Sequence, residues 1–456
     1  MDTELRTQVQ DILKDAEKKV PYAVASIFRN RGSEINLEKK EERLSSARSK
    51  LGFVLSLFNG EYFEEFATDK LEKNHITKFC RSAIDEIAVK DIKYEITSDS
   101  CGKKSFKTKE RVDPDSLSIS EKIDIFRHRR AQILAGKNVI NCRIVYSDEL
   151  SNKEIINSRG ILTEELRHIA HSLMVYVSNG SVVKYDYLSV GGTGGFELTS
   201  ISENDIDQLI ANANRLLEAE KIQPDVYDIV ATPEISGLIA HEAFGHGVET
   251  DMYLKDRARS REYLGKVIAS PLVSIVDDPT LQGGYGSYFI DDEGFQAQPT
   301  YIIKKGRFVQ GLTNSYASSV LNLPPTANGR RESFARKVYT RMSNTFFEPG
   351  TTTPSEIIGS VANGIYLIKG LSGMEDPKGW GIQVLVLYGK EIRNGKLTGR
   401  IFSPLGITGF VPELLSNISM VGNDFKVDLG ICGKGYKEYI PVSSGGPHIK
   451  TRARIG

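Results

Sequence analysis

Near the middle of the chain stands the sequence TPEISGLIAHEAFGH, which occupies residues 232–246. It follows a short run, residues 226–230, whose composition is typical of a β-strand. Thr232 is a favoured N-cap residue, Pro233 suits the first helical turn, and Glu234 complements the positive end of the helix dipole. A helix is therefore predicted to begin here.

The apolar residues of this predicted helix share one face. Ile235, Leu238 and Ile239 have the i, i+3, i+4 spacing of an amphipathic helix. The next position on the same face is Glu242. A carboxylate on an apolar face loses hydration, which raises its pKa toward the range that suits a general base. The pattern therefore indicates a functional role for Glu242.

Two histidines, His241 and His246, flank this glutamate in a pattern one residue longer than the zinc-binding sequence H-E-x-x-H. Positions i and i+5 differ by roughly 140° around a helix, so a regular helix cannot direct both imidazoles to one ion. A helix end or bulge at Gly245 would bring the second imidazole back. Metal binding thus predicts a distorted helix end. The alternative is two ordinary histidines and a Glu242 bonded to a neighbouring helix.

The third ligand of such a site does not follow from this segment. A catalytic zinc ion generally takes three protein ligands and keeps one position for water. The candidates are Glu249 and Asp251 nearby, and Cys432 and His448 far along the chain. Glycines flank Cys432, and Lys434 beside it could help to hold a thiolate, although a lone cysteine is usually an inert core thiol. All four candidates stay open at this point.

Size and composition limit the class of protein. The chain has 456 residues, which predicts two or three domains, and its 59 basic and 59 acidic residues give a formal net charge of zero. This balance argues against a dedicated nucleic-acid or anionic-membrane binder. The first twenty residues are amphipathic, and no run of eighteen apolar residues occurs. We expect a cytoplasmic protein without a membrane partner or direct nucleic-acid contact.

The cysteine pattern also favours a cytoplasmic location. The four cysteines, Cys80, Cys101, Cys142 and Cys432, have neither paired nor Cys-x-x-Cys spacing. Such spacing fits a reducing environment and argues against a disulfide framework.

The fold class predicted from the sequence is α+β. An N-terminal region resembling an α/β sandwich is followed by a sheet-rich C-terminal domain that carries the helix with the histidines. We place an N-terminal α+β domain at residues 1–92, a middle α+β region at residues 93–224, and the C-terminal domain at residues 225–456.

Local signals add detail to this scheme. Asn179-Gly180 lies between strand-like runs and predicts a hairpin with a type I′ turn. Further hairpins are predicted around Lys305-Gly306 and Asn394-Gly395. Residues 32–48 are charged and predict a loop. A helix is expected around His168 and His171, which are interpreted as ordinary residues.

The sequence HEAFGHGVETD, residues 241–251, closely resembles the hallmark of the TldD/PmbA metallopeptidase family, specifically its TldD branch. The similarity spans residues 225–440. Six further segments agree with the family in the same order, namely DDEG at 291–294, NGRR at 328–331, RMSNT at 341–345, PELL at 412–415, VGND at 421–424 and CGK at 432–434.

This resemblance implies a function and a set of ligands. His241, His246 and Cys432 would hold one zinc ion per chain, and Glu242 would activate a water molecule. The implied protein is a zinc-dependent peptidase for unfolded or extended peptides, which a sheet-rich domain can bind by strand addition. The resemblance also implies a dimer, either of two identical chains or with a PmbA-like subunit.

Other polar residues near these segments have less definite roles. Glu249 and Asp251 would orient a ligand histidine or contact substrate, with plain surface acids as the alternative. Arg330 and Arg331 would bind a substrate carboxylate or pair with the acids of residues 291–293, which otherwise form an acidic turn.

Two rival functions are also compatible with the sequence. In the first, the chain is a non-catalytic subunit that binds peptides or supports assembly. In the second, Cys432 is a nucleophile with a histidine as its base.

Overall fold

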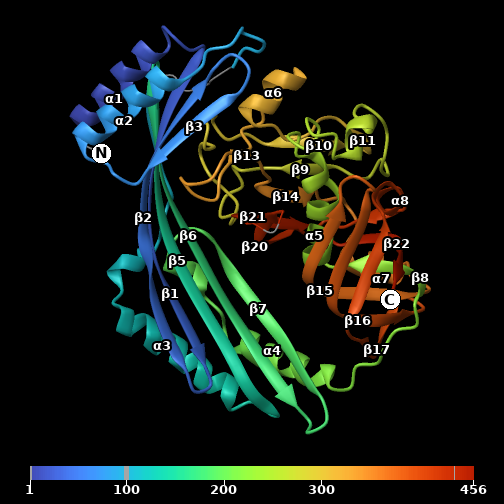
Figure 1. Ribbon diagram of the computed structural model, residues 1–456. Coiled ribbons are helices and arrows are strands. Elements are labelled where there is room, and N and C mark those ends of the chain that lie inside the picture. Colours follow the sequence, from blue (N-terminus) through green and yellow to red (C-terminus); the bar gives the residue numbers. More distant parts are fainter. Residues whose placement is uncertain (1–2, 97–101, 436) are drawn as a thin grey trace.

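A computed structural model describes residues 3–96, 102–435 and 437–456. Figure 1 shows a long, curved sheet with helices that is formed by the N-terminal half, and a sheet-rich C-terminal half that lies beside it. The α+β class and the sheet-rich C-terminal region predicted from the sequence are therefore confirmed.

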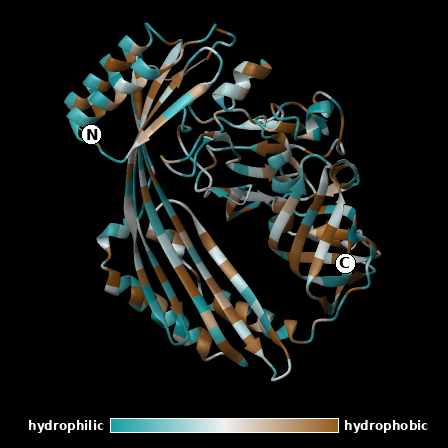
Figure 2. Ribbon diagram, viewed as in Figure 1, coloured by the Kyte–Doolittle hydropathy of each residue, from teal (hydrophilic) through white to brown (hydrophobic). Residues whose placement is uncertain are grey.

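The N-terminal half is built on a seven-stranded sheet of order β3-β2-β1-β5-β6-β4, in which β7 also pairs with β6. Along its strands apolar and polar segments alternate, as Figure 2 shows by colour. This alternation is typical of strands with one buried face. The strands are β1 (Tyr22–Glu38), β2 (Glu42–Phe58), β3 (Phe63–Thr68), β4 (Gly102–Lys107), β5 (Val139–Asn157), β6 (Gly160–Ser178) and β7 (Val183–Thr193).

Four helices cover this sheet in two pairs (Figure 1). One pair, α1 (Thr3–Ala16) and α2 (Lys73–Glu86), shares a core with β1 and β2. The other pair, α3 (Ile119–Leu134) and α4 (Glu203–Leu216), shares a second core with β5 and β6. Short 3-10 turns stand at Pro114–Ser116 and Phe196–Thr199.

Two expectations for this half are wrong. Residues 32–48 belong to β1 and β2, which pair in antiparallel register from Gly32 opposite Ala47 to Leu37 opposite Glu42. Ile35 and Leu37 are fully buried and hold β1 to the core, so the charged residues around them do not indicate a loop. His168 and His171 lie on strand β6, not on a helix.

The division of the chain into three domains stays a prediction. Strands on both sides of residue 92 lie in the same sheet, because β1 pairs with β5 along its length, from Val24 opposite Asn157 to Glu38 opposite Arg143.

The C-terminal half contains two large sheets. One is seven-stranded, of order β15-β8-β22-β18-β16-β17 with β19 paired to β22, and the other is six-stranded, of order β11-β10-β9-β14-β21-β20. The first sheet comprises β8 (Asp225–Ala231), β15 (Asn363–Asp376), β16 (Gly381–Arg393), β17 (Lys396–Phe402), β18 (Leu405–Phe410), β19 (Met420–Val421) and β22 (Ile449–Ile455). The second comprises β9 (Ile275–Asp277), β10 (Thr300–Lys304), β11 (Arg307–Phe308), β14 (Asn344–Phe347), β20 (Lys426–Lys434) and β21 (Lys437–Gly446).

Smaller elements complete this half. A two-stranded sheet pairs β12 (Gly329–Arg330) with β13 (Tyr339–Thr340). The helices are α5 (Pro233–Phe244), α6 (Ser315–Leu321), α7 (Pro354–Gly359) and α8 (Val411–Ser416), and 3-10 turns stand at His246–Val248 and Arg259–Tyr263.

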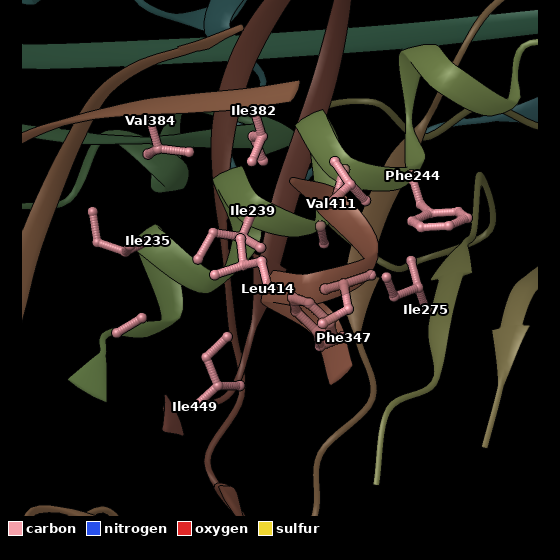
Figure 3. Packing of buried hydrophobic residues seen from close by; sticks show 14 of the residues in the cluster. Ile235, Ile239, Phe244, Ile275, Phe347, Ile382, Val384, Val411, Leu414 and Ile449 are labelled. Carbon is pink, nitrogen blue, oxygen red and sulfur yellow. The ribbon is translucent and has the colours of Figure 1, made fainter. Parts of the chain in front are cut away.

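Helix α5 lies between the two large sheets and packs on β15, β14 and β21. Its residues Ile235, Ile239 and Phe244 are fully buried in the largest apolar cluster of the protein. Figure 3 shows these side chains among those of the surrounding strands and of α8. The helix predicted from residues 232–246 is therefore confirmed, and it forms the centre of this half.

The predicted hairpins differ in their outcome. At Lys305-Gly306 and Asn394-Gly395 both residues have positive φ, 48° and 80° in the first and 48° and 73° in the second, as a type I′ turn requires. The Asn179-Gly180 hairpin joins β6 to β7 through four residues instead. The Asn179 side chain accepts hydrogen bonds from the backbone N–H groups of Ser181 and Val182, which stabilises this wider loop.

The cysteines of the described segments are free thiols at Cys80, Cys142 and Cys432. Cys101 lies outside the described residues. In the same segments, no helix is long and apolar enough to cross a membrane.

A glycine permits the close approach of α5 to the second sheet. A Cβ atom on Gly237 would overlap the backbone of Gly445 in β21, which also lies against the helix. The backbone of a strand cannot move aside as a flexible side chain can. Gly237 therefore sets the distance between α5 and the strand that pairs with β20.

We predict that Gly237→Ala lowers the free energy of unfolding by about 1–3 kcal/mol, because the added methyl group overpacks this contact. Gly359→Ala is the matched control. Its Cβ would meet nothing within 4 Å, and alanine is about 0.5–1 kcal/mol more favourable than glycine in a helix. Urea unfolding of both variants measures the difference. Equal stabilities would contradict the prediction.

Candidate metal centre

Helix α5 ends just before the second histidine. Its last residue is Phe244, Gly245 has φ −102° and ψ −79°, and a 3-10 turn then begins at His246. A Cβ on Gly245 would overlap the Met342 sulfur and the His241 carbonyl oxygen, so a larger residue does not fit. The break in the helix that the histidine spacing predicted is confirmed.

The start of α5 agrees only in part with the capping predicted from the sequence. Pro233 occupies the first turn, but the Thr232 side chain makes no capping hydrogen bond. Glu234 is engaged instead, because it accepts hydrogen bonds from the Tyr187 hydroxyl of β7 and from the backbone N–H of Gly370 in β15.

The break brings both imidazoles to the sulfur of Cys432 on β20. His241 Nε2 lies 3.3 Å from Cys432 Sγ, and His246 Nε2 lies 3.1 Å from the same atom. The three ligand atoms are all within 4.8 Å of one another. His241 and Cys432 are only 6% and 5% exposed. One nitrogen from each histidine and one sulfur therefore face a common point in the interior.

These donors fit a metal ion of the zinc type. Bond lengths of about 2.0–2.1 Å to nitrogen and 2.3 Å to sulfur place the two atoms roughly 3.6 Å apart in a tetrahedral site. The observed separations of 3.3 Å and 3.1 Å require only small adjustments. Two imidazoles with a thiolate are a donor set that zinc favours.

His448, the other distant candidate, is engaged elsewhere. Its Nδ1 lies 2.7 Å from Asp424 Oδ2, and its Nε2 lies 2.9 Å from the Tyr366 hydroxyl oxygen. Both ring nitrogens are thus occupied, and His448 is not part of the cluster of ligand atoms.

The cluster favours ionised Cys432. Burial acts to raise the pKa of this thiol, but the adjacent His241 and His246 outweigh it and hold the pKa well below its usual range. Burial raises the pKa of Cys80 to about 12, and it is the main cause that raises the pKa of Cys142 to about 11. Among the cysteines of the described segments, Cys432 is therefore the one whose surroundings stabilise a thiolate, which is the form that binds metals.

Glu249 is buried against the second histidine. It is 1% exposed, and its Oε2 lies 3.3 Å from His246 Nδ1. A carboxylate at Nδ1 favours the tautomer in which Nε2 is free to face the sulfur. Glu249 Oε1 accepts a hydrogen bond of 3.1 Å from Arg341 Nε, and Lys434 Nζ lies 3.0 Å from Glu249 Oε2.

Asp251 belongs to the same charged network. It is 8% exposed and binds Lys434 Nζ at 2.7 Å and 2.9 Å. The interpretation of Glu249 and Asp251 as surface acids is therefore wrong. Lys434 binds these two carboxylates, and within the described chain it forms no hydrogen bond with the Cys432 sulfur.

Glu242 faces the cluster without a fixed partner. It is 7% exposed, and its side chain lies against Gly373 of β15, where a Cβ would overlap it. Within the described segments, no hydrogen bond or ion pair holds its carboxylate. Burial raises its pKa, although the neighbouring histidines act in the opposite direction. A carboxylate whose pKa is raised is a stronger base than an ordinary carboxylate.

Two residues of the site were not identified from the sequence. The carboxylate oxygens of Glu375, on β15, are buried beside Gly247, and within the described chain no side chain hydrogen-bonds to them. Burial raises its pKa well above the usual range. Arg341 binds Glu249 and donates a hydrogen bond of 3.0 Å to the Cys432 carbonyl oxygen. Neither residue has a sequence spacing that relates it to the histidines.

The paired arginines do not join the ligand cluster. Arg331 Nη2 binds Glu65 of β3 at 2.8 Å, and Arg330 Nη1 donates to the Met342 carbonyl oxygen at 2.6 Å. The expected pairing with residues 291–293 is made through the backbone, because the Arg331 N–H donates a hydrogen bond of 2.8 Å to Asp292 Oδ2. Within the described chain, neither guanidinium forms an ion pair with these acids. Those acids have other partners, since Asp292 binds Lys153 and Glu293 accepts hydrogen bonds from Ser315.

Comparison with known proteins covers both halves of the chain. Residues 112–220 match the model of the PmbA/TldA metallopeptidase central domain, and residues 224–455 match that of the C-terminal domain. The chain belongs to the PmbA/TldA metallopeptidase family. The family resemblance seen in the sequence is therefore confirmed.

Individual members of the PmbA/TldA family agree with this result. A metalloprotease of Methanothermobacter thermautotrophicus is 32% identical over 463 residues, which cover 98% of this chain and 97% of the relative. A protein of Saccharolobus solfataricus named zinc metalloprotease TldD homolog is 30% identical, over 54% of this chain and 56% of its own length.

The solved structures show the same fold. A Thermotoga maritima protein described as a candidate modulator of a DNA gyrase superposes with a TM-score of 0.78, over 99% of this chain and 100% of that chain. Its sequence identity is 17%, so this likeness concerns the fold.

We predict that Arg341→Met lowers the free energy of unfolding by about 3 kcal/mol, because it leaves the buried Glu249 with one fewer cation. This value lies at the low end for a broken buried pair because Lys434 remains. The control is Arg43→Met, whose pair with Glu41 is largely exposed (76% and 58%). It should cost at most about 1 kcal/mol. Denaturant unfolding distinguishes the two, and similar losses would contradict the prediction.

Proposed function

We propose that this chain is a zinc-dependent peptidase that hydrolyses peptide bonds in unfolded or extended peptides. His241, His246 and Cys432 would hold one zinc ion, and Glu242 would be the general base. The convergence of three ligand atoms within 4.8 Å, beside a carboxylate without a partner, supports this proposal. As the family resemblance implies, we expect the chain to act as a homodimer or with a PmbA-like subunit.

Each side chain of the site would have a separate role in hydrolysis. A zinc ion supplies Lewis acidity, somewhat weakened here because the thiolate ligand adds negative charge. Glu242 takes a proton from a water molecule and later delivers it to the leaving amine. Its raised pKa makes the carboxylate a stronger base than an ordinary one, which suits the first of these steps. Glu249 holds His246 in one orientation, and Arg341 and Lys434 hold Glu249.

The position of Cys432 suggests how a peptide would bind. Strand β20 stands at the end of its sheet and pairs, within the described chain, with β21 alone. Ile431, next to the ligand cysteine, is 58% exposed. An extended peptide that adds as a further strand here would use main-chain hydrogen bonds and would pass the ligand cluster. Strand addition recognises the backbone of the peptide, and an unfolded peptide exposes its backbone. This binding mode therefore favours unfolded substrates.

The proposal predicts that the metal and the general base can be removed separately. Protein purified with zinc should carry about one ion per chain, and Cys432→Ser and His246→Ala should lose it. Glu242→Gln should keep the ion but lose about 10²- to 10⁴-fold in the cleavage rate of an unfolded peptide. Elemental analysis and a peptide cleavage assay measure the two effects. A zinc-free wild type, or full activity of Glu242→Gln, would refute the proposal.

Removal of the carboxylate behind His246 should weaken metal binding without removing a ligand. We expect Glu249→Gln to lower zinc affinity about 10- to 100-fold, because a neutral amide holds the imidazole less firmly. The control is Glu391→Gln, since Glu391 is also buried and ion-paired but lies on β16 with Arg393 and Arg400. Zinc transfer to a chromogenic chelator measures both variants. Equal affinities would exclude this role for Glu249.

A further inference from the structure

A cavity of about 370 Å³ lies between the first sheet and the C-terminal half. Residues of β1, β2 and β3 line one side of it, including Val24 and Phe63. The segments around residues 251–255, 292–295, 314–316 and 337–339 line the rest. Pockets of roughly 300–1,000 Å³ are those that take small molecules or single large side chains.

The walls of this cavity are rich in aromatic rings. Val24, Leu254 and Val338 add aliphatic surface. The aromatic residues are Tyr22, Tyr62, Phe63, Phe295, Tyr316 and Tyr339. Rings in such numbers provide faces and edges against which another aromatic ring can stack.

The acidic side chains of the cavity already have partners within the protein. Glu65 pairs with Arg331, and Asp292 pairs with Lys153. Glu293 accepts hydrogen bonds from the backbone N–H and the hydroxyl of Ser315. None of these groups therefore requires a cationic ligand.

The basic side chains also disfavour a cation. Lys255 and Lys337 line the same cavity and are exposed, and Lys255 Nζ lies 5.8 Å from the centre of the Tyr339 ring. A lysine or arginine side chain of a ligand would meet two like charges at this place. The lining thus suits an uncharged, ring-shaped group.

The cavity adjoins the candidate metal centre. Asp251 lines it and binds Lys434 Nζ, two residues after the ligand Cys432. Tyr339 also lines it, and Lys434 Nζ lies 5.7 Å from the centre of its ring. Lys434 in turn reaches Glu249, which binds His246. Asp251, Lys434 and Glu249 thus lie between the cavity and the ligand His246, a separation that an extended peptide spans with a few residues.

We propose that this cavity binds a large aromatic side chain of the substrate peptide. The inference rests on the proposed peptidase function, because it takes the peptide to lie at the metal centre. Main-chain pairing along β20 would hold any extended peptide, and the aromatic cavity would select among peptides by one residue. The substrate class is then unfolded peptides with an exposed phenylalanine, tyrosine or tryptophan.

Peptide binding to the Glu242→Gln protein tests this proposal without cleavage. Three labelled peptides of otherwise identical serine-rich sequence carry phenylalanine, alanine or lysine at one central position, and fluorescence anisotropy gives their affinities. The phenylalanine peptide should bind at least about tenfold more tightly than the alanine peptide. Two further substitutions are each combined with Glu242→Gln. Tyr62→Ala removes an aromatic wall of the cavity, and Leu254→Trp fills its space. Each should reduce the preference for phenylalanine over alanine to less than about threefold.

Tyr176→Ala is the matched control, since this half-exposed tyrosine lies on β6 outside the cavity. It should keep the full preference. Equal binding of the three peptides, a preference for lysine, or a phenylalanine preference that both cavity variants retain would overturn the proposal. Cleavage by the zinc-loaded wild type is measured separately. Its absence would refute the peptidase function, while the binding preference would still decide whether the cavity selects aromatic residues.

Discussion

The buried carboxylate of Glu249 joins three parts of the chain that are far apart in sequence. It binds His246 after α5, Arg341 before β14 and Lys434 at the end of β20. A carboxylate with 1% exposure is stable only among such partners, because burial without cations would cost several kcal/mol. When Lys434 is held there, Cys432 two residues earlier lies against the histidines. The ionic network thus positions the ligands that the helix itself cannot bring together.

The two halves of the protein contribute different residues to the candidate site and its surroundings. The C-terminal half supplies all the ligand atoms and Glu242, with α5 packed between two sheets. The N-terminal sheet supplies walls, since β1, β2 and β3 line the aromatic cavity and Tyr187 of β7 binds Glu234 at the start of α5. The aromatic cavity is therefore shared by both halves, whereas the candidate metal centre lies in the C-terminal half.

Errors in the sequence-based predictions have physical causes. Residues 32–48 were predicted to form a loop because charged residues dominate their sequence. In the structure, Ile35 and Leu37 are buried at alternate positions and hold the segment in a long hairpin. His168 and His171 lie on a strand that pairs on both sides, where the surrounding strands decide the structure. The Asn179 side chain stabilises a wider loop than the dipeptide alone suggests. Glu375 could not be predicted from the sequence, because only the path of β15 through the fold brings it near the histidines.

The sequence by itself determined the helix of residues 233–244, its break at Gly245, and the carboxylate on its buried face. Each depends on neighbours within one or two turns, so spacing and residue type suffice. Tertiary structure decided which distant residue meets the histidines, how Glu249 is neutralised, and which rings line the cavity. These depend on contacts between strands of different sheets, such as Cys432, 186 residues after His246. Local spacing carries no information about such distances, because packing of α5 between the sheets sets them.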